Sequence, residues 1–526
     1  MPPDNPLPVK HKRRQKIKFT WVSLRKGIQL VSLALFLFLF IASRDSGLPG
    51  DLLNFFLRLD PLAIFAKFLS SKTFLVGSSL AILTVILTIT VGRAWCGWIC
   101  PLGTTLDILT PGRKKFDETK APRPSWRTVK YGILLTTLVA ALFGNLTLLI
   151  LDPLTILLRT LTVSVLPAID HLTSSAERGL SNFEFLQDPV SSFDSLIRPA
   201  ILPNLPIYYR DAILFTVVFI IVAALNWIAP RFWCRYLCPL GALLGLISKI
   251  SIFRRAVGED CKDCKICSTR CPTGTIDAEK GYASDPSECT LCLDCLEQCP
   301  RSSIKLAPGF KPAAWQKYDP GRRQVLASIA AAFVGIALFK SDVTAFRDTN
   351  FLIRPPGARE NDLLTKCIRC GECVRSCPFG ALQPARLESG LEGMWSPLVV
   401  ARIGPCDYGC NACGQVCPVQ AIPPLSLDEK RQKVIGRAYI DQNRCIAWAD
   451  HKDCIVCEEM CPIPEKAVVL TKTDIVDSDG TTVTIQLPSV QRERCIGCGI
   501  CEYKCPVNGE AAIRVYVPEK KSGFFS

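Results

Sequence analysis

Residues 261–272 read CKDCKICSTRCP, and residues 289–300 repeat the pattern as CTLCLDCLEQCP. Both follow the spacing Cys-x2-Cys-x2-Cys-x3-Cys-Pro. In bacterial ferredoxins three thiolates at this spacing surround one face of a four-iron cluster, and the fourth, before proline, binds the second cluster of a pair. The stretch therefore predicts an α+β, bacterial-ferredoxin-like module with two [4Fe-4S] clusters.

This crossed arrangement assigns every cysteine of the module to one of its two clusters. The first cluster takes Cys261, Cys264, Cys267 and Cys299. The second takes Cys289, Cys292, Cys295 and Cys271.

Four further motifs ending in Cys-Pro follow in the C-terminal part. Structural zinc is the alternative interpretation, but zinc sites favour two Cys-x2-Cys hooks separated by a longer loop. Six motifs ending in Cys-Pro predict six [4Fe-4S] clusters, and such small units need the metal for much of their folding energy. The four C-terminal motifs, of which the second and third are spacing variants, are Cys367, Cys370, Cys373, Cys377; Cys406, Cys410, Cys413, Cys417; Cys445, Cys454, Cys457, Cys461; and Cys495, Cys498, Cys501, Cys505.

Uncharged apolar runs predict a polytopic α-helical membrane domain. Hydrophobic residues make up 49% of the chain and charged residues 21%, a balance that argues against a wholly soluble protein. Each run is close to the ~20 residues that cross the hydrocarbon core. Lys and Arg are enriched before the first run and between the second and third, which places those segments in the cytoplasm and residues 44–72 and 152–211 outside it. The four runs are residues 27–43, 73–92, 131–151 and 212–230.

A fifth apolar run, residues 324–339, follows Arg322 and Arg323. The two arginines resemble a twin-arginine export signal, here internal, and they favour a fifth crossing over a short buried helix with a basic cap. The residues after this run are then expected in the periplasm.

These patterns divide the chain into five parts. They are a basic cytoplasmic N-terminus, 1–26; a four-helix membrane domain, 27–255; a cytoplasmic two-cluster ferredoxin module, 256–308; a linker with the twin arginines and the fifth apolar run, 309–345; and a periplasmic four-cluster polyferredoxin domain, 346–526.

The membrane part contains an internal repeat. Residues 93–103, RAWCGWICPLG, align with residues 231–241, RFWCRYLCPLG, and Asp60-Pro-Leu aligns with Asp152-Pro-Leu. The pattern predicts two parallel two-helix repeats related by an axis along the membrane normal. Most of the extra residues of the second repeat fall within 167–210.

The repeat supplies two Cys-x3-Cys-Pro pairs, formed by Cys96, Cys100, Cys234 and Cys238. Together they could hold a seventh iron–sulfur cluster, with two helix N-termini directed at the anionic group. A redox-active thiol pair is an equal alternative. Asp60 and Asp152 are interpreted as helix N-caps rather than proton acceptors. The aromatic residues beside the cysteines are interpreted as an interfacial belt rather than a quinone platform.

Other classes of protein are not indicated. The net charge of +15 needs no nucleic-acid partner, because anionic clusters and membrane topology account for basic residues. The three histidines lie outside the predicted crossings, and no Cys-x-x-Cys-His occurs, so no haem is expected. No Gly-x-Gly-x-x-Gly follows a strand-like run, so neither a flavin nor an NAD site is indicated.

Residues 1–310 resemble the NapH (MauN-like) type of membrane ferredoxin protein, which has four helices, two Cys-x3-Cys-Pro motifs and a two-cluster module. Residues 318–526 resemble its NapG (MauM-like) partner, on the stretch Arg354-Pro-Pro-Gly-Ala358 and on the Cys445-x8-Cys454 spacing. The chain thus resembles a natural fusion of the two. The spacing Cys406-x3-Cys410 departs from the family pattern. For the C-terminal motifs the resemblance implies nested pairing, first with fourth and second with third.

The resemblance also implies a function. Electrons would pass from the membrane quinol pool through the [4Fe-4S] clusters to a redox partner protein, a reductase or cytochrome, with the chain in the bacterial inner membrane. It would then be an electron-transfer subunit more than an enzyme. The alternatives are a reductase that maintains a metal ion or a partner metalloenzyme, and an assembly scaffold whose clusters are structural.

Overall fold

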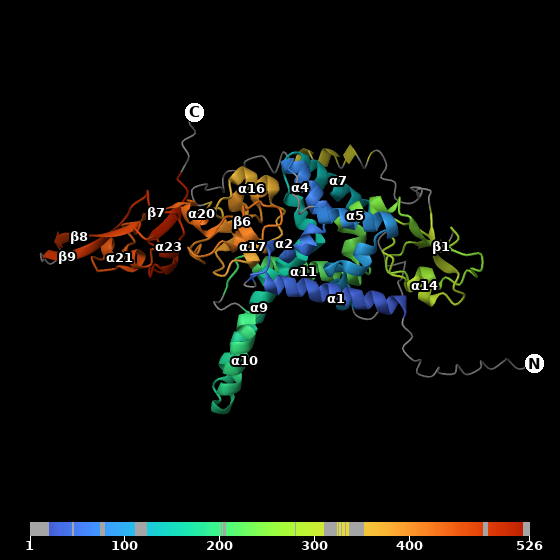
Figure 1. Ribbon diagram of the computed structural model, residues 1–526, viewed down its shortest axis with the longest axis horizontal. Helices are drawn as coiled ribbons and strands as arrows, with labels where there is room; N and C mark the ends of the chain where they lie inside the picture. The colour runs from blue at the N-terminus through green and yellow to red at the C-terminus, as the bar shows by residue number, and fades with distance from the viewer. Residues whose placement is uncertain are drawn as a thin grey trace, which may run out of the picture.

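The computed structural model describes residues 20–44, 47–73, 79–110, 124–200, 202, 207–278, 280–309, 352–476 and 482–518, with a few single residues between 323 and 335. A helical domain lies in the middle (Figure 1). The ferredoxin module lies at one end of it and the C-terminal cysteine motifs lie at the other. The predicted fifth crossing at 324–339 falls largely outside the described residues.

Two helices among the described residues are long and apolar enough to cross a membrane. They are α1 (Trp21–Ala42) and the continuous helix Pro153–Leu180. Of these two, α1 coincides with a predicted crossing and Pro153–Leu180 does not. The helices at the remaining three predicted crossings are shorter: α5 (Leu80–Val91), α7 (Thr128–Leu142) and α11 (Ala212–Ala224). Gly92 follows α5 at φ 77° and ends that helix at the last residue of its predicted apolar run. The polytopic membrane domain therefore stays a prediction.

The segments predicted to lie between the crossings, residues 44–72 and 152–211, contain helices that are partly or wholly buried in the helical domain. After the short helices α2 (Gly50–Leu53) and α3 (Phe55–Arg58), α4 (Pro61–Ser71) packs against α7. Every residue of α8 (Pro153–Thr160) is buried. Both helices contain several Leu and Ile residues, but their uncharged stretches are too short for hydropathy alone to identify them as buried helices.

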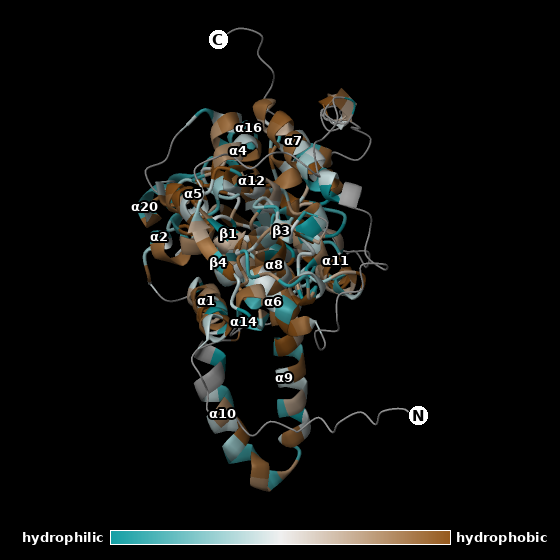
Figure 2. Ribbon diagram, turned by 90° about the vertical axis from the view of Figure 1, so that its right-hand side faces the viewer, coloured by the Kyte–Doolittle hydropathy of each residue, from teal (hydrophilic) through white to brown (hydrophobic). Residues whose placement is uncertain are grey.

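The repeat is visible in matching elements. A π-helical turn, η2 (Trp95–Ile99), leads into α6 (Pro101–Leu109), and η8 (Trp233–Leu237) leads into α12 (Pro239–Ser248). In the second repeat α8 continues through η5 (Leu161–Val165) into α9 (Leu166–Leu180). The extra residues form α9 and α10 (Gln187–Ala200), a helical hairpin that projects from the body across the direction of α1 (Figure 2).

The ferredoxin module is closed by an antiparallel strand pair. β1 (Phe253–Val257) precedes the first motif and pairs with β4 (Ile304–Pro308), which follows the second. β2 (Ile276–Asp277) and β3 (Ala283–Ser284) form a smaller pair between the motifs. The short helices α13 (Ile266–Thr269) and α14 (Asp294–Gln298) carry the third cysteine of each motif and pack together.

The C-terminal part consists of two halves, each with a strand pair between its two cysteine motifs. In its first half β5 (Leu382–Pro384) pairs with β6 (Pro397–Val399), and α16 (Glu360–Lys366) leads into the first motif. In its second half β7 (Arg437–Ile440) pairs with β10 (Ile513–Tyr516), and β8 (Val468–Val476) forms a hairpin with β9 (Thr482–Val490). The remaining helices are α17 (Glu372–Arg375), α18 (Gly390–Gly393), α19 (Ala412–Gln415), α20 (Leu427–Gln432), α21 (Ile446–Ala449), α22 (Val456–Glu459) and α23 (Ile500–Lys504).

The two cysteine-rich parts contact opposite ends of α1. Near its N-terminus Arg25 pairs with Asp294 of the ferredoxin module at 3.3 Å. Near its C-terminus the Phe40 carbonyl accepts from Arg375 Nε at 3.2 Å. Arg25 and Phe40 are 15 residues apart, which is about 22 Å at 1.5 Å per residue, or roughly three quarters of a bilayer's hydrocarbon thickness.

Candidate iron–sulfur centres

In the ferredoxin module the cysteines meet in the crossed sets that the sequence predicts. Two cavities lie side by side in the module, and each is lined by three cysteines of one motif and the last cysteine of the other. One contains Cys261, Cys264, Cys267 and Cys299. The other contains Cys271, Cys289, Cys292 and Cys295.

The C-terminal motifs pair with their sequence neighbours, so the nested pairing is wrong. Cys417 lies beside Cys370 and Cys373, and Cys377 lies beside Cys406 and Cys413. In the second half Cys461 lies beside Cys498. A cavity there brings together Cys445, Cys454, Cys457 and Cys505.

The physical reason is the closing strand pair. β7 precedes the third motif and pairs with β10 after the fourth, as β1 and β4 enclose the ferredoxin module. α17 packs on α19, and α22 packs on α23, so neighbouring motifs share one small core. If the first motif paired with the fourth and the second with the third, β7 and β10, which hydrogen-bond to each other here, would be separated.

The backbone around each regular motif is shaped as a cradle. The residues on both sides of the second cysteine have positive φ in all four regular motifs, including Asp263 at 47° and Lys265 at 57° in the first. Non-glycine residues adopt this conformation at a cost, which a bound group can offset. Gly371 and Gly499 occupy the same place in later motifs, at 87° and 77°.

Backbone amides complete the cradle for the cysteine before proline. Cys377 accepts hydrogen bonds from the amides of Phe379, Ala381 and Leu382. Cys417 accepts from Val419, Ala421 and Ile422, at the same offsets. Donors directed at sulfur favour the thiolate, which is the form that binds iron. The residues therefore fit anionic iron–sulfur clusters.

Burial disfavours the thiolate form of these cysteines when no metal is bound. It raises the pKa of Cys289, Cys406 and Cys457 to about 12 and that of Cys498 to about 11. Such thiols lose their protons when a metal cation binds, so cluster insertion and folding are coupled. Among the described residues, no three Cys, His, Asp or Glu side chains are close enough to hold a single metal ion.

The two Cys-x3-Cys-Pro pairs meet in the core of the helical domain, beside the ferredoxin module. Cys96, Cys100, Cys234 and Cys238 are all buried in one core and are close neighbours. α6 and α12 each begin with proline directly after a cysteine. The Cys238 sulfur accepts from the Gly241 amide at 3.2 Å, and Cys100 accepts from Gly103 in the same way. Two helix N-termini are thus directed at the sulfurs, an arrangement suited to an anionic group.

Arginines of the repeat flank this centre. Arg93 Nη2 lies 4.0 Å from the Cys96 sulfur, and Arg231 donates to the Cys96 carbonyl at 2.9 Å. Arg231 also pairs with Asp107 at 2.5 Å. α1 holds the turn between Cys96 and Cys100 in place, because Gln29 of α1 donates a hydrogen bond to the Gly97 carbonyl at 3.0 Å.

The aromatic residues of the repeat are not an interfacial belt, which corrects that interpretation. Trp95, Trp233 and Tyr236 are buried in the protein. Trp98 donates to the Leu291 carbonyl of the ferredoxin module at 2.9 Å. These side chains fill the space around the cysteines because the docked module covers that end of the helical domain.

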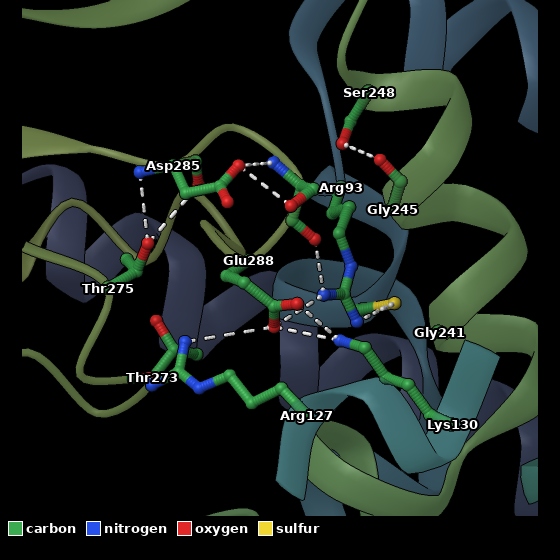
Figure 3. A network of polar contacts seen from close by, with 12 residues as sticks. Arg93, Arg127, Lys130, Gly241, Gly245, Ser248, Thr273, Thr275, Asp285 and Glu288 are labelled. Carbon is green, nitrogen blue, oxygen red and sulfur yellow. Dashed lines mark hydrogen bonds and ion pairs between the residues drawn. The ribbon is translucent and has the colours of Figure 1, made fainter. Parts of the chain in front are cut away.

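A buried ionic network joins the ferredoxin module to the Cys-x3-Cys-Pro centre (Figure 3). Glu288, which precedes Cys289, contacts Lys130 at 2.7 Å, Arg93 at 3.5 Å and Arg127 at 3.9 Å. Burial alone would raise the pKa of Glu288, but the three cations outweigh it and lower that pKa. The sequence analysis did not predict this network. The one pattern that pointed to it was the Arg-x-Trp-Cys shared by both halves of the repeat, which contains Arg93.

The backbones of the ferredoxin module and the Cys-x3-Cys-Pro centre are also in close contact. Gly97, between Cys96 and Cys100, lies against the Thr290 carbonyl, and a side chain at Gly97 would collide with that oxygen. Thr290 lies between Cys289 and Cys292. The second cysteine set of the module therefore lies directly against the Cys-x3-Cys-Pro centre.

Comparison with known families agrees with this geometry. A profile described as a 4Fe-4S binding domain matches residues 73–117 and 212–258, the two halves of the repeat, and another so described matches 488–509. Profiles described as 4Fe-4S dicluster domains match 366–422 and 282–378. The first of these covers the two motifs that pair in the structure. The second spans motifs that lie at opposite ends of the helical domain.

Curated relatives match part of the chain. The methylamine utilization ferredoxin-type protein MauM of Methylorubrum extorquens is 35% identical over 207 residues, which are 38% of this chain and 89% of that protein. The ferredoxin-type protein NapG of Escherichia coli is 35% identical over 213 residues, 38% of this chain and 87% of that protein. YccM of Escherichia coli is 27% identical over 242 residues, 44% of this chain and 56% of that protein. No solved structure matches the chain.

The cysteine sets, their cradles and these matches define an iron–sulfur electron-transfer protein with several ferredoxin-like modules. Within that class the chain belongs to the NapG/MauM family of ferredoxin-type proteins.

The pairing of the C-terminal motifs gives a direct test. We expect Cys505→Ser to damage the cluster held by the third motif, because Cys505 lines that cavity. Its electron paramagnetic resonance spectrum, recorded on the reduced full chain, should lose the signal that Cys454→Ser also loses. Loss of the signal that depends on Cys370 would restore the nested pairing.

Proposed function

We propose that the chain conducts electrons across the bacterial inner membrane, from the quinol pool to a redox partner protein, along one row of cysteine sites. Six sets would hold [4Fe-4S] clusters and the Cys-x3-Cys-Pro centre would hold a seventh cluster. When bound, such clusters accept and pass on single electrons. The observation that carries the proposal is the continuity of the row from one end of the helical domain to the other.

The first link joins the ferredoxin module to the Cys-x3-Cys-Pro centre. Gly97 packs on Thr290, and Trp98 bonds to the Leu291 carbonyl. Arg231 neighbours both Cys234 and Cys292, so one buried cation serves the two sites. The Glu288 network fixes their relative position.

The second link crosses to the C-terminal part through α8. The first turn of α8 follows Asp152, which lies beside Cys238. Near its other end Arg159 lies beside Cys367 and Cys370 and packs against Gly371. α8 has eight residues, so the link is about 12 Å long at 1.5 Å per residue. The same hydrophobic core contains the cysteines at both ends.

The last link lies within the C-terminal part. The Cys406 amide donates to the Cys498 carbonyl at 2.9 Å, which brings the second and fourth motifs together. The variant spacing at Cys406 thus sits where the two halves meet. The final cavity, with Cys445 and Cys505, lies at the far end of the row and is the candidate exit to a partner.

The surface of the helical domain supports a location in the membrane. On α5, Ile82, Leu83 and Ile86 are exposed, and on α11 Ile213 is 81% exposed. Contiguous apolar surface of this kind marks contact with lipid or protein. Together with the length of α1, it supports a membrane domain whose two ends carry the two cysteine-rich parts on opposite sides.

The sidedness has a direct test. A reporter fused after residue 310 should be cytoplasmic and one fused after residue 526 periplasmic, because the two parts contact opposite ends of α1. Paired fusions to a protein that fluoresces only in the cytoplasm and to a phosphatase active only in the periplasm would measure it. Equal behaviour at both positions would place all six motifs on one side.

Quinol oxidation is tested on the purified full chain in lipid vesicles under anaerobic conditions. A reduced membrane quinol should bleach the visible absorbance of the clusters, whereas an oxidised quinone should not. Failure of several quinols to reduce clusters that dithionite does reduce would overturn the assignment of quinol as the donor.

A further inference from the structure

A third cavity lies where α5 ends against the ferredoxin module. Its volume is about 200 Å³. It is lined by the last residues of α5, by the connection from α12 into β1, and by the segment that leads into the second cysteine motif. Cys289 is the one cysteine among its described lining residues, so this cavity is separate from the two that contain the cysteine sets.

One polar group of the lining has no partner. Ser251 is 1% exposed, and its Oγ forms no hydrogen bond with any described residue. The hydroxyl lies beside the end of α5, since a Cβ at Gly92 would be 3.8 Å from Ser251 Oγ and 3.9 Å from Leu291. A buried hydroxyl without a partner costs free energy, and a ligand oxygen in the cavity would remove that cost.

The two arginines of the lining are engaged elsewhere. Arg254 Nε donates to the Ser251 carbonyl at 2.8 Å, and its Nη2 donates to the Lys249 carbonyl at 2.7 Å. Arg255 Nη1 donates to the Tyr282 carbonyl, while its Nε and Nη2 receive no partner among the described residues. Arg255 also lines both cavities of the cysteine sets, where its charge would compensate anionic clusters. The neutral Ser251 hydroxyl is therefore the group left for a ligand, which favours a neutral ligand over a phosphate.

Apolar side chains form the rest of the cavity and its rim. Val91 and Leu291 line it, and so does Phe253, which is 44% exposed. Ile250 and Ile252, beside Phe253 in the chain, are exposed as well. α5, whose exposed face is apolar, packs against β1 at this point. A ligand that arrives from the lipid would thus meet apolar surface up to the cavity.

The cavity also borders the row of cysteine sites. Cys289 lines both this cavity and the cavity of the second cysteine set. The Leu291 carbonyl accepts the hydrogen bond of Trp98, which lies between Cys96 and Cys100. A ligand here would lie against the second cysteine set, at the place where that set meets the Cys-x3-Cys-Pro centre.

We propose that this cavity binds the head group of the membrane quinol. The Ser251 hydroxyl holds one ring oxygen, and the isoprenoid tail leaves over Phe253 towards the lipid. Drug-sized ligands occupy pockets of about 300 Å³ or more, so this smaller cavity suits a single-ring head group whose tail stays outside. The choice of a quinol rests on the proposed function. The binding site itself rests on the cavity, its unpaired hydroxyl and its apolar rim.

Photoaffinity labelling of the full chain in lipid vesicles tests the site. The probe is an azido-benzoquinone with a short isoprenoid tail, added to anaerobic, oxidised protein, and mass spectrometry locates the adducts. We expect adducts within residues 250–255 or 284–291 that an excess of unlabelled quinone removes. Val91→Phe, which narrows the cavity, should lower this labelling at least tenfold. Val217→Phe is the matched control, because Val217 is exposed on α11 and does not line the cavity.

Ser251→Ala tests the hydroxyl separately. It should weaken competition by unlabelled quinone several-fold and leave the melting temperature and iron content unchanged, because Ser251 Oγ has no partner to lose among the described residues. This variant keeps the test valid if Val91→Phe does not fold.

Three results would overturn the site: adducts confined to other parts of the chain, equal labelling of Val91→Phe and Val217→Phe, or a phospholipid that copurifies with the parent and that quinone does not displace. The proposed function fails independently. Specific labelling of the cavity without bleaching by quinol would keep the binding site and overturn quinol as the donor. Bleaching by quinol with adducts elsewhere would do the reverse.

Discussion

Replacing Cys96 and Cys234 together by serine should remove one cluster of the full chain and stop electron transfer from quinol to the C-terminal part. Each pair would lose one of its two ligands, and the four sulfurs form a single buried site. Iron analysis of anaerobically purified protein should show a loss of about four irons per chain if the group is a cubane. Quinol-dependent bleaching of the remaining clusters should fall to the level of the uncatalysed control.

Cys264→Ser is the matched control for this experiment. Cys264 belongs to the first cysteine set of the ferredoxin module, and electrons that enter the row from quinol at the Cys-x3-Cys-Pro centre would reach the C-terminal part without passing through that set. Its replacement should cost a similar amount of iron and leave reduction of the C-terminal clusters intact. Iron content unchanged by the double replacement would contradict a seventh cluster and favour a redox-active thiol pair.

Glu288→Gln should be the most damaging single change outside the cysteines. It would leave Lys130, Arg93 and Arg127 without their common carboxylate in a buried site. Breaking a buried ion pair by removing one partner costs about 3–5 kcal/mol. We therefore expect a lower melting temperature and release of the ferredoxin module from the helical domain, measured by faster proteolysis near residue 310.

A double variant that removes a cation together with the carboxylate separates the effect of charge on stability from the effect of packing. The double variant Glu288→Gln with Lys130→Met should recover part of the lost stability, since it restores the net charge of the site. Arg178→Gln, on the exposed hairpin, is a control that should change little, because its polar contacts are at the surface. A Glu288→Gln protein as stable as the parent would show that the network does not hold the module in place.

Much of the candidate chemistry could be predicted from residue spacing. The cysteine triplets before Cys-Pro and the Asp60 and Asp152 caps are local patterns, and local backbone geometry decides them. The crossed sets of the ferredoxin module join two motifs, and the regular spacing of both motifs predicts them. The internal repeat likewise indicated that Cys96 and Cys234 are equivalent. The uncharged runs did not predict α4 or α8, because Lys67 and Arg159 interrupt the apolar stretches of these two helices.

The sequence alone determined which residues can hold clusters, because three thiols spaced three residues apart wrap a cluster whatever lies around them. Only the tertiary structure decided which motifs pair, since β7 and β10 bring together segments separated by more than seventy residues. It also decided the contacts of the Glu288 network. Those contacts join residues distant along the chain. They form because a charge buried in a shared core without an oppositely charged partner costs free energy.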